Sequence, residues 1–311
     1  MGSETPPDPL SDLPPDQSDQ NPIEFPLWDK VIAQTQYALK SGALQPIDTD
    51  YAWIEQGGIT FLVRISTNLI RKAEAKRASS AQPTGSNPFL PYDPDLFVAN
   101  LSQTHLCLLN KYNVTDHHLL IVTRAFEPQE TLLELPDFEA LWLCIRGLGM
   151  HEIESLGFYN SGKQAGASQP HRHLQLVPLP LTPANSLPIQ VALDAAVETA
   201  DLLHSPMLPF RHAAVGLPKT TTADAVHAAY LMLLNHLELN GPEPPPYNLL
   251  VTSQWMLLVP RQQEQFESLP VNALGFAGSL FVRNPAQLEQ LKQLGPLALL
   301  SQVAVQDNPF S

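Results

Sequence analysis

The residues best suited to do chemistry in this chain lie within positions 166–177, which read Gly-Ala-Ser-Gln-Pro-His-Arg-His-Leu-Gln-Leu-Val. In a β-strand, side chains two residues apart point to the same face, so His171, His173 and Gln175 would share one face and Arg172 would point to the other. Three polar groups are therefore expected to converge on one place.

The small residues before the histidines are expected to form an anion-binding loop. Glycine and other small residues let backbone N–H groups approach an anion closely. A histidine with its ordinary pKa near ~6.5 is mostly neutral at pH 7, so it can attack phosphorus without a base. A covalent histidine intermediate would split a transfer between two large anions into two displacements. The segment thus indicates transfer of a phosphorus-containing group.

A zinc site is the alternative for two histidines at this spacing, because the same spacing suits a metal pair. No Cys, Asp or Glu stands nearby in the sequence as a third ligand, so we expect no metal site. His171 by itself is interpreted as a hydrogen-bonded orienting residue. The pair His117 and His118 is predicted to be solvated near a hairpin turn, and Cys107 and Cys144 are predicted to be small core residues.

The motif H-x-H-x-Q preceded by G-A-S-Q-P resembles the ATP adenylyltransferases, also called diadenosine tetraphosphate phosphorylases, in the nucleotidyltransferase branch of the histidine triad superfamily. Galactose-1-phosphate uridylyltransferases are more distant relatives of that family. The similarity spans about residues 50–285. It includes Asn87-Pro88-Phe89, Leu106–Val122, Val122-Thr123-Arg124, Asn160-Ser161-Gly162, Tyr247-Asn248 and Pro260-Arg261.

The resemblance implies that His173 is the catalytic nucleophile and takes up AMP covalently. His173 would attack the α-phosphorus of diadenosine tetraphosphate and expel ATP, and inorganic phosphate would then attack the adenylylated histidine and leave as ADP. Gln175 stands where histidine triad hydrolases have a third histidine. An amide can orient and hydrogen-bond but cannot exchange protons, so Gln175 suits transfer to phosphate better than hydrolysis.

The resemblance also implies the other site residues, with His171 assisting at the catalytic centre. Lys72 would meet substrate phosphates, although Arg71-Lys72-Ala73 lacks the expected proline and leaves Arg71 as an alternative. Asn160 would make a polar contact near the nucleophile, and Arg261 would either contact the polyphosphate or be a surface cation. The remaining expected contacts are Asn87 and Pro88 beside the nucleotide, Gly166, Ala167, Ser168 and Gln169 in the phosphate loop, and Asn248, Thr252 and Met256 at the second nucleotide.

Two other functions stay open on the sequence alone: a hydrolase of dinucleoside polyphosphates or nucleoside phosphoramidates, and a non-catalytic nucleotide sensor. Hydrolysis would proceed without phosphate, and a sensor would bind without forming product. We expect no cofactor for the covalent step, whereas Mg²⁺ could accompany the polyphosphate because divalent cations neutralise phosphate charge. The expected partners are small nucleotides, namely diadenosine tetraphosphate, ATP and ADP, together with phosphate.

Hairpin patterns with flanking helices predict an α+β fold. The resemblance implies a histidine-triad-like antiparallel sheet in a two-part body like that of the uridylyltransferases. Prolines clustered at 178–188 divide a predicted N-terminal catalytic domain, residues 27–185, from a C-terminal ATP adenylyltransferase domain, residues 186–311. Periodicity predicts strands at 59–65, 104–111, 118–124, 157–160, 171–177, 248–251 and 255–259, and helices at 27–44, 138–148, 193–204, 223–239 and after Pro285.

Acidic residues dominate the charge, with 31 Asp and Glu against 17 Lys and Arg and a net charge of −14. This charge argues against nucleic acid or an anionic membrane as a general partner. Residues 1–26 contain seven prolines, six acidic residues and no Lys or Arg, which predicts a disordered tail. No signal-peptide pattern and no apolar run of about 18 residues is present, and with only two cysteines we expect a soluble cytoplasmic protein.

Overall fold

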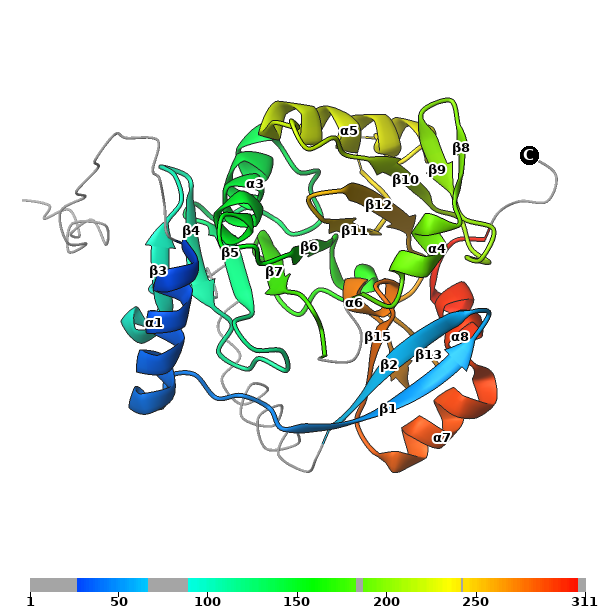
Figure 1. Ribbon diagram of the computed structural model, residues 1–311, viewed down its shortest axis with the longest axis horizontal. Helices are drawn as coiled ribbons and strands as arrows, with labels where there is room; N and C mark the ends of the chain where they lie inside the picture. Colours follow the sequence, from blue (N-terminus) through cyan, green and yellow to red (C-terminus); the bar gives the residue numbers. More distant parts are fainter. Residues whose placement is uncertain (1–26, 67–88, 183–186, 242, 307–311) are drawn as a thin grey trace, which may run out of the picture.

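The computed structural model describes residues 27–66, 89–182, 187–241 and 243–306 (Figure 1). The predicted tail at residues 1–26 lies outside these ranges, as do three expected substrate contacts, Lys72, Asn87 and Pro88. All the other expected site residues lie within them.

A ten-stranded sheet forms the centre of the molecule, in the order β3-β4-β5-β7-β6-β11-β12-β10-β9-β8. Every neighbouring pair in it is antiparallel, which confirms the predicted α+β class with an antiparallel sheet. Its strands are β3 (Phe97–Asn100), β4 (His105–Leu109), β5 (Leu119–Thr123), β6 (Ser155–Asn160), β7 (His173–Pro178), β8 (Val197–Thr199), β9 (Leu202–His204), β10 (Ala213–Gly216), β11 (Tyr247–Val251) and β12 (Trp255–Pro260).

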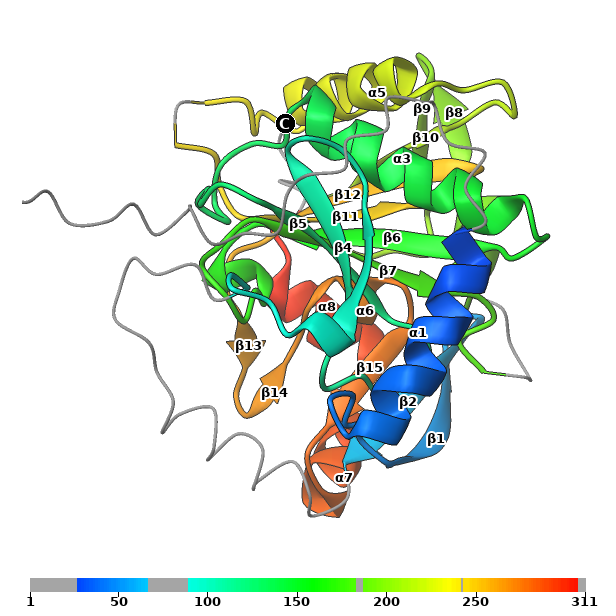
Figure 2. The same ribbon diagram turned by 90° about the vertical axis from the view of Figure 1, so that its left-hand side faces the viewer.

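Helices cover one face of this sheet. They are α1 (Leu27–Ser41), α3 (Leu135–Gly149) and α5 (Ala223–His236), and Figure 2 shows α3 and α5 above the strands. The apolar stripe of α3 packs here, with Phe138, Trp142 and Ile145 buried against the sheet. Cys107 and Cys144 are free thiols in the same core, so their predicted role as small core residues is confirmed.

The described residues cover only part of the opposite face. A three-stranded sheet, in the order β1-β2-β15, packs there with three helices and a short hairpin (Figure 2). These elements are β1 (Thr49–Gln56), β2 (Ile59–Ser66), β13 (Gln265–Phe266), β14 (Leu269–Pro270), α6 (Ala273–Phe276), β15 (Ser279–Val282), α7 (Pro285–Leu294) and α8 (Pro296–Val303). Short helical turns complete the description: η1 (Pro94–Leu96), η2 (Lys163–Ala165) and α4 (Gln190–Asp194).

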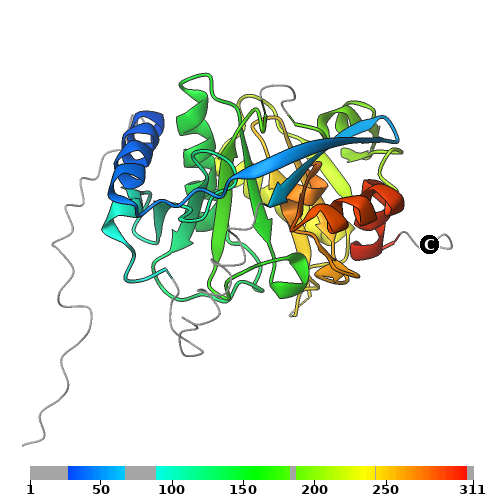
Figure 3. The ribbon, with the colours of Figure 1, turned by 90° about the horizontal axis from the view of Figure 1, so that it is seen from below.

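Two pairings join the predicted N- and C-terminal segments. β6 pairs with β11 in the large sheet, and β2 pairs in parallel with β15 in the small one. Figure 3 shows the β1–β2 hairpin, in blue, reaching across to the orange and red C-terminal helices. The predicted division between residues 185 and 186 therefore separates two sequence segments that share both sheets. The domain boundary itself stays a prediction.

The predicted helix at 193–204 is wrong. The helix α4 ends at Asp194, and β8 and β9 follow as a hairpin at the edge of the large sheet. Between these strands Ala200 and Asp201 both have positive φ, at 50° and 66°, the backbone that a tight hairpin turn requires. The other predicted helices and strands are found within a few residues of their expected positions. In the described residues no helix is both long and apolar enough to cross a membrane.

Candidate active site

His173 is the first residue of β7 and its side chain is buried. Along this strand Leu174 and Leu176 face the core under the helices, so His173 and Gln175 face the partly covered side, as predicted. The Nδ1 of His173 lies 2.8 Å from the carbonyl oxygen of His171. A carbonyl oxygen can only accept, so Nδ1 carries the proton and Nε2 carries the lone pair.

Burial decides the charge of this imidazole. It lowers the pKa of His173 to about 4, because desolvation disfavours the charged form. No described residue hydrogen-bonds to Nε2. At neutral pH the ring is therefore an uncharged nucleophile whose reactive nitrogen is not engaged by these residues.

Gln175 is oriented by a histidine that the sequence analysis placed in solvent. The Nδ2 of Asn110 donates to Nδ1 of His118 at 3.1 Å, so Nε2 of His118 carries the proton and donates to Oε1 of Gln175 at 3.0 Å. His118 is buried and its pKa is lowered to about 4 by that burial. The prediction of a solvated His118 is wrong, because its side chain faces Gln175 on the neighbouring strand. Counting in twos along the predicted strand 118–124 would have put His118 on the same face as Val122, but would not have shown its partner.

The orientation of Gln175 has a chemical consequence. With Oε1 accepting from His118, the amide NH₂ group is left to donate to a ligand. A hydrogen-bond donor in this place suits the oxygen atoms of a phosphoryl group.

His171 lies just before β7, at an isolated bridge to Pro128. Its Nε2 donates to the carbonyl oxygen of Thr123 at 2.8 Å, while Nδ1 is buried without a hydrogen-bond partner among the described residues. Burial lowers the pKa of His171. The Phe89 ring lies 5.7 Å from the His171 ring and 5.1 Å from the His173 ring, centroid to centroid. The geometry suits the orienting role expected for His171.

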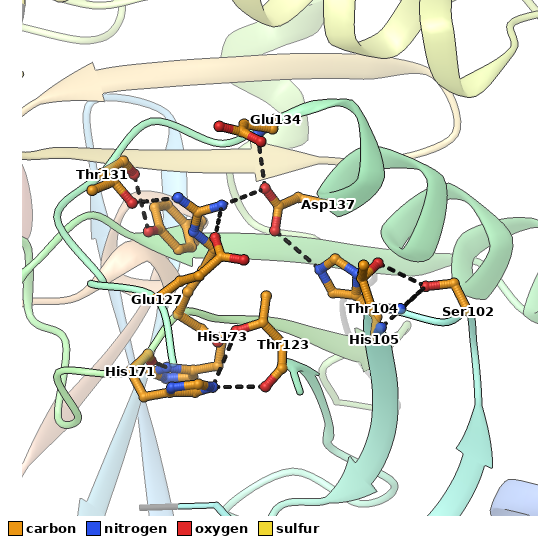
Figure 4. A network of polar contacts seen from close by, with 12 residues as sticks. Ser102, Thr104, His105, Thr123, Glu127, Thr131, Glu134, Asp137, His171 and His173 are labelled. Carbon is orange, nitrogen blue, oxygen red and sulfur yellow. Dashed lines mark hydrogen bonds and ion pairs between the residues drawn. The ribbon is translucent and has the colours of Figure 1, made fainter. Parts of the chain in front are cut away.

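Arg172 is buried on the opposite face of the strand, where it enters an ionic network with Asp137 and Glu127. Figure 4 shows Asp137, Glu127 and His105 of this network. The Nη1 of Arg172 donates to Asp137 at 3.0 Å and to Glu127 at 2.5 Å. The second oxygen of Asp137 lies 3.1 Å from Nε2 of His105. Since Asp137 lies in the first turn of α3, the network ties the residue between the two histidines to that helix.

The loop between β6 and β7 contains two glycines with positive φ, Gly162 at 80° and Gly166 at 90°. A Cβ atom on Gly166 would lie 2.7 Å from the carbonyl oxygen of Val271, so only glycine fits there. The N–H groups of Gly166 and Ala167 donate within the loop, to the carbonyl oxygens of Lys163 and Gly162. This corrects the expectation that those two N–H groups face an anion.

Ser168 and Gln169 follow in the same loop. No described residue accepts a hydrogen bond from either backbone N–H group. Of the four expected loop contacts, these two therefore have donors available for a phosphate.

Three of the expected binding residues form one buried cluster. The side-chain NH₂ of Asn248 donates to Oδ1 of Asn160 and to the carbonyl oxygen of Ala165, both at 2.9 Å. The N–H of Ala273 also donates to Oδ1 of Asn160, so among the described residues the Asn160 amide NH₂ is left as a donor. Arg261 donates through Nη1 to the Asn248 side chain and to the Ala165 carbonyl oxygen.

Arg261 is 1% exposed, so its interpretation as a surface cation is wrong. Burial lowers the pKa of its guanidinium group to about 9. The further acceptors of its N–H groups are the carbonyl oxygens of Val303, Gln263, Glu264 and Val271. With its donors used inside the protein, Arg261 holds the phosphate loop rather than a phosphate, and so does Asn248. This corrects the expectation that Arg261 and Asn248 contact a nucleotide directly.

Thr252 and Met256 do not reach the cluster. Thr252 lies four residues beyond Asn248, about 13 Å along an extended strand. There its hydroxyl accepts from the N–H groups of Gln254 and Trp255. Met256 is fully buried in the core under the helices, on the face of the sheet away from His173. Met256 therefore cannot contact a nucleotide on the His173 side of the sheet, whereas the expected contact of Thr252 with the second nucleotide stays a prediction.

Comparisons with known proteins match this chain to two family models. Residues 17–195 match the family model of the Ap4A phosphorylase N-terminal domain, and residues 206–306 match that of the ATP adenylyltransferase C-terminal domain. The chain is 27% identical to diadenosine 5′,5‴-P1,P4-tetraphosphate phosphorylase 2 of Saccharomyces cerevisiae, covering 87% of this chain and 91% of that protein.

The fold is also similar to solved structures. Yeast Ap4A phosphorylase Apa2 in complex with AMP aligns with a TM-score of 0.77 at 25% identity, covering 92% of this chain and 99% of that one. The same enzyme in complex with Ap4A aligns with a TM-score of 0.76 at 25% identity, covering 91% and 99%.

Proposed function

This chain belongs to the Ap4A phosphorylase family, and we propose that it catalyses the reversible phosphorolysis of diadenosine tetraphosphate (Ap4A) to ATP and ADP through AMP bound covalently to His173. The observation that supports this most is the hydrogen bond from Nδ1 of His173 to the His171 carbonyl oxygen. It fixes the tautomer that presents Nε2, and burial keeps that nitrogen unprotonated.

Two displacements complete the reaction. In the first, the Nε2 lone pair attacks the α-phosphorus of Ap4A, an N–P bond forms, and the P–O bond to the departing ATP breaks. In the second, an oxygen of inorganic phosphate attacks the same phosphorus, and the N–P bond breaks to release ADP. The positive charge of the adenylylated imidazole is stabilised by the Nδ1–H donated to the His171 carbonyl oxygen.

The described residues favour phosphate over water as the second nucleophile. Water needs a base, whereas phosphate is already an anion. Gln175 has no basic group, both ring nitrogens of His118 are engaged, one by Asn110 and one by Gln175, and the unpartnered Nδ1 of His171 is buried. Among the described residues, the donors available to stabilise phosphoryl oxygens are the Gln175 and Asn160 amides and the Ser168 and Gln169 N–H groups.

The test is incubation with Ap4A, with and without phosphate, followed by nucleotide chromatography. Equal amounts of ATP and ADP, formed only with phosphate, are expected. AMP and ATP formed without phosphate would instead identify a hydrolase, and binding without product would identify a sensor.

The nucleophile is tested by substitution. His173→Ala is expected to abolish the AMP adduct, detected as a mass increase of the denatured protein, and to lower turnover by about 10³-fold or more. His151→Ala, at an exposed position, is the matched control and should behave as the unmodified chain does. Phosphorolysis at the normal rate by His173→Ala would refute the proposal.

The remaining assignments belong to the same proposal. The H-x-H-x-Q motif supports membership of the histidine triad superfamily, and the two free, buried cysteines suit the cytoplasm. Mg²⁺ would enter with the polyphosphate as part of the substrate. Adding EDTA should therefore weaken Ap4A turnover.

A further inference from the structure

Gln129 belongs to none of the motifs considered so far, yet its side chain is bonded to the backbone of the nucleophile. The residue is fully buried, in the irregular segment between β5 and α3. Its Oε1 accepts the backbone N–H of His173 at 2.9 Å, and its Nε2 donates to the carbonyl oxygen of His173 at 3.3 Å. The same Nε2 donates to the carbonyl oxygen of Asn160 at 2.8 Å.

These bonds occur where two strands separate. The pairing of β6 with β7 runs from Ser155 opposite Pro178 to Phe158 opposite Gln175. Continued in the same register, it would place Asn160 opposite His173. The Gln129 amide lies between these two residues instead and supplies the donor and the acceptor that a neighbouring strand would supply.

Gln129 is itself held in place by its backbone. Its N–H donates to the carbonyl oxygen of Pro170 at 2.9 Å, and the hydroxyl of Tyr159 donates to its carbonyl oxygen. Beside it, the N–H of Arg172 donates to the carbonyl oxygen of Glu127 at 2.7 Å. The amide is therefore fixed from both sides before it reaches His173.

We propose that Gln129 is a positioning residue for the nucleophile: it holds β6 and β7 apart and fixes the backbone of His173, so that Nε2 is directed at the α-phosphorus. The inference rests on the proposed function. If the amide were lost, the strands could pair at Asn160 and His173, or water could enter between them. Either change would move the imidazole relative to the phosphate loop.

Misplacing a reacting group by about 1 Å can slow a reaction by about 100-fold. Gln129→Ala is therefore expected to slow adduct formation by about 100-fold in a single turnover with Ap4A, with little change in KM, because the residue contacts no substrate. Gln262→Ala is the matched control. Gln262 is exposed and its amide also donates to a carbonyl oxygen, that of Gln302, so its loss should leave the rate unchanged.

Gln129→Glu gives a readout that a purely structural role would not give. Ionised, the new carboxylate would face the carbonyl oxygens of Asn160 and His173, and burial between them would raise its pKa. Protonated, it would again offer one donor and one acceptor. The ratio of its rate to that of the unmodified chain should therefore rise as the pH is lowered from 8 to 5.5, a range in which His173, with its pKa of about 4, stays neutral.

The outcomes separate the two proposals. If the unmodified chain and Gln262→Ala form no adduct, the proposed function fails. If they form it and the Gln129 variants match their rate, or if the ratio for Gln129→Glu does not change with pH, the positioning role is refuted. If neither Gln129 variant folds at any pH, Gln129 is structural only, and the positioning role is again refuted.

Discussion

At the scale of single residues, the site depends on which nitrogen of each imidazole carries the proton. In both His173 and His118 the hydrogen-bond partner of Nδ1 decides which nitrogen is protonated, and the two partners have opposite effects. A carbonyl acceptor places the proton of His173 on Nδ1, and an amide donor places that of His118 on Nε2. One ring thereby presents a lone pair, whereas the other orients Gln175 through an N–H group.

The lowered pKa of His173 predicts the pH dependence of adduct formation. Attack requires the neutral ring, so the single-turnover rate with Ap4A should stay constant from pH 8 down to about 5 and fall only near pH 4. The measurement omits phosphate, so that its own ionisation does not enter. A rate that halves near ~6.5, the ordinary pKa of histidine, would contradict this prediction.

The same burial makes the stability of the protein depend on pH, because the folded and unfolded states bind different numbers of protons. Between about pH 4 and ~6.5 the unfolded chain binds protons on His118 and His173 that the folded chain does not. The free energy of unfolding should therefore fall as the pH is lowered through this window, which can be measured by denaturant titration alongside the rates.

At the scale of elements, the start of β7 is held on the side of α3 and at the edge that faces β6. Arg172 ties it to the start of α3 through Asp137, and the Gln129 amide holds it apart from β6. Arg261 and Asn248 hold the preceding loop through the Ala165 carbonyl oxygen. The nucleophile thus stands on a fixed strand while the loop beside it is fixed by a different part of the chain.

The network behind β7 predicts a large loss of stability when one partner is removed. Asp137→Ala should lower the free energy of unfolding by about 3–5 kcal/mol, because it leaves Arg172 and His105 buried without their shared carboxylate. Denaturant unfolding measures this. The matched control is Glu289→Ala, which breaks an exposed pair with Lys292 and should cost less than about 1 kcal/mol. Equal effects at the two sites would contradict the prediction.

At the scale of the whole molecule, the site is built from both sequence segments. The nucleophile and the phosphate loop come from residues before the predicted boundary, and the side chains that hold the loop, Asn248 and Arg261, come from beyond it. The two segments also share both sheets through β6 with β11 and β2 with β15. Net charge belongs to this scale as well, because six of the acidic residues lie in residues 1–26, outside the described structure.

Removal of residues 1–25 is predicted to leave kcat/KM for Ap4A within about twofold, because none of the site residues lies there and a charged tail steers ligands only weakly at physiological salt. Steady-state kinetics on the shortened chain measures this. The family match begins at residue 17, so a second chain lacking residues 1–16 is the control. Loss of activity in the longer deletion alone would show that residues 17–25 contribute.

The sequence by itself determined the family, the shared face of the motif and most of the elements around it. The period of two put His173 and Gln175 on one face and Arg172 on the other, and apolar spacing located α1, α3, α5 and the hairpins β4–β5 and β11–β12, because these patterns depend only on residues close in the chain. It could not show that β8 and β9 replace a helix, since sheet pairing overrode a short apolar pattern.

Only the tertiary structure decided the contacts between residues far apart in sequence. It buried Arg261 under the phosphate loop, placed Met256 on the wrong face of the sheet for a nucleotide, and brought His118 to Gln175. Gln129 shows the reason most clearly: no pattern marks it, because its neighbours follow no period and its partners at Asn160 and His173 lie 31 and 44 residues away. Such a contact exists only once the strands are assembled.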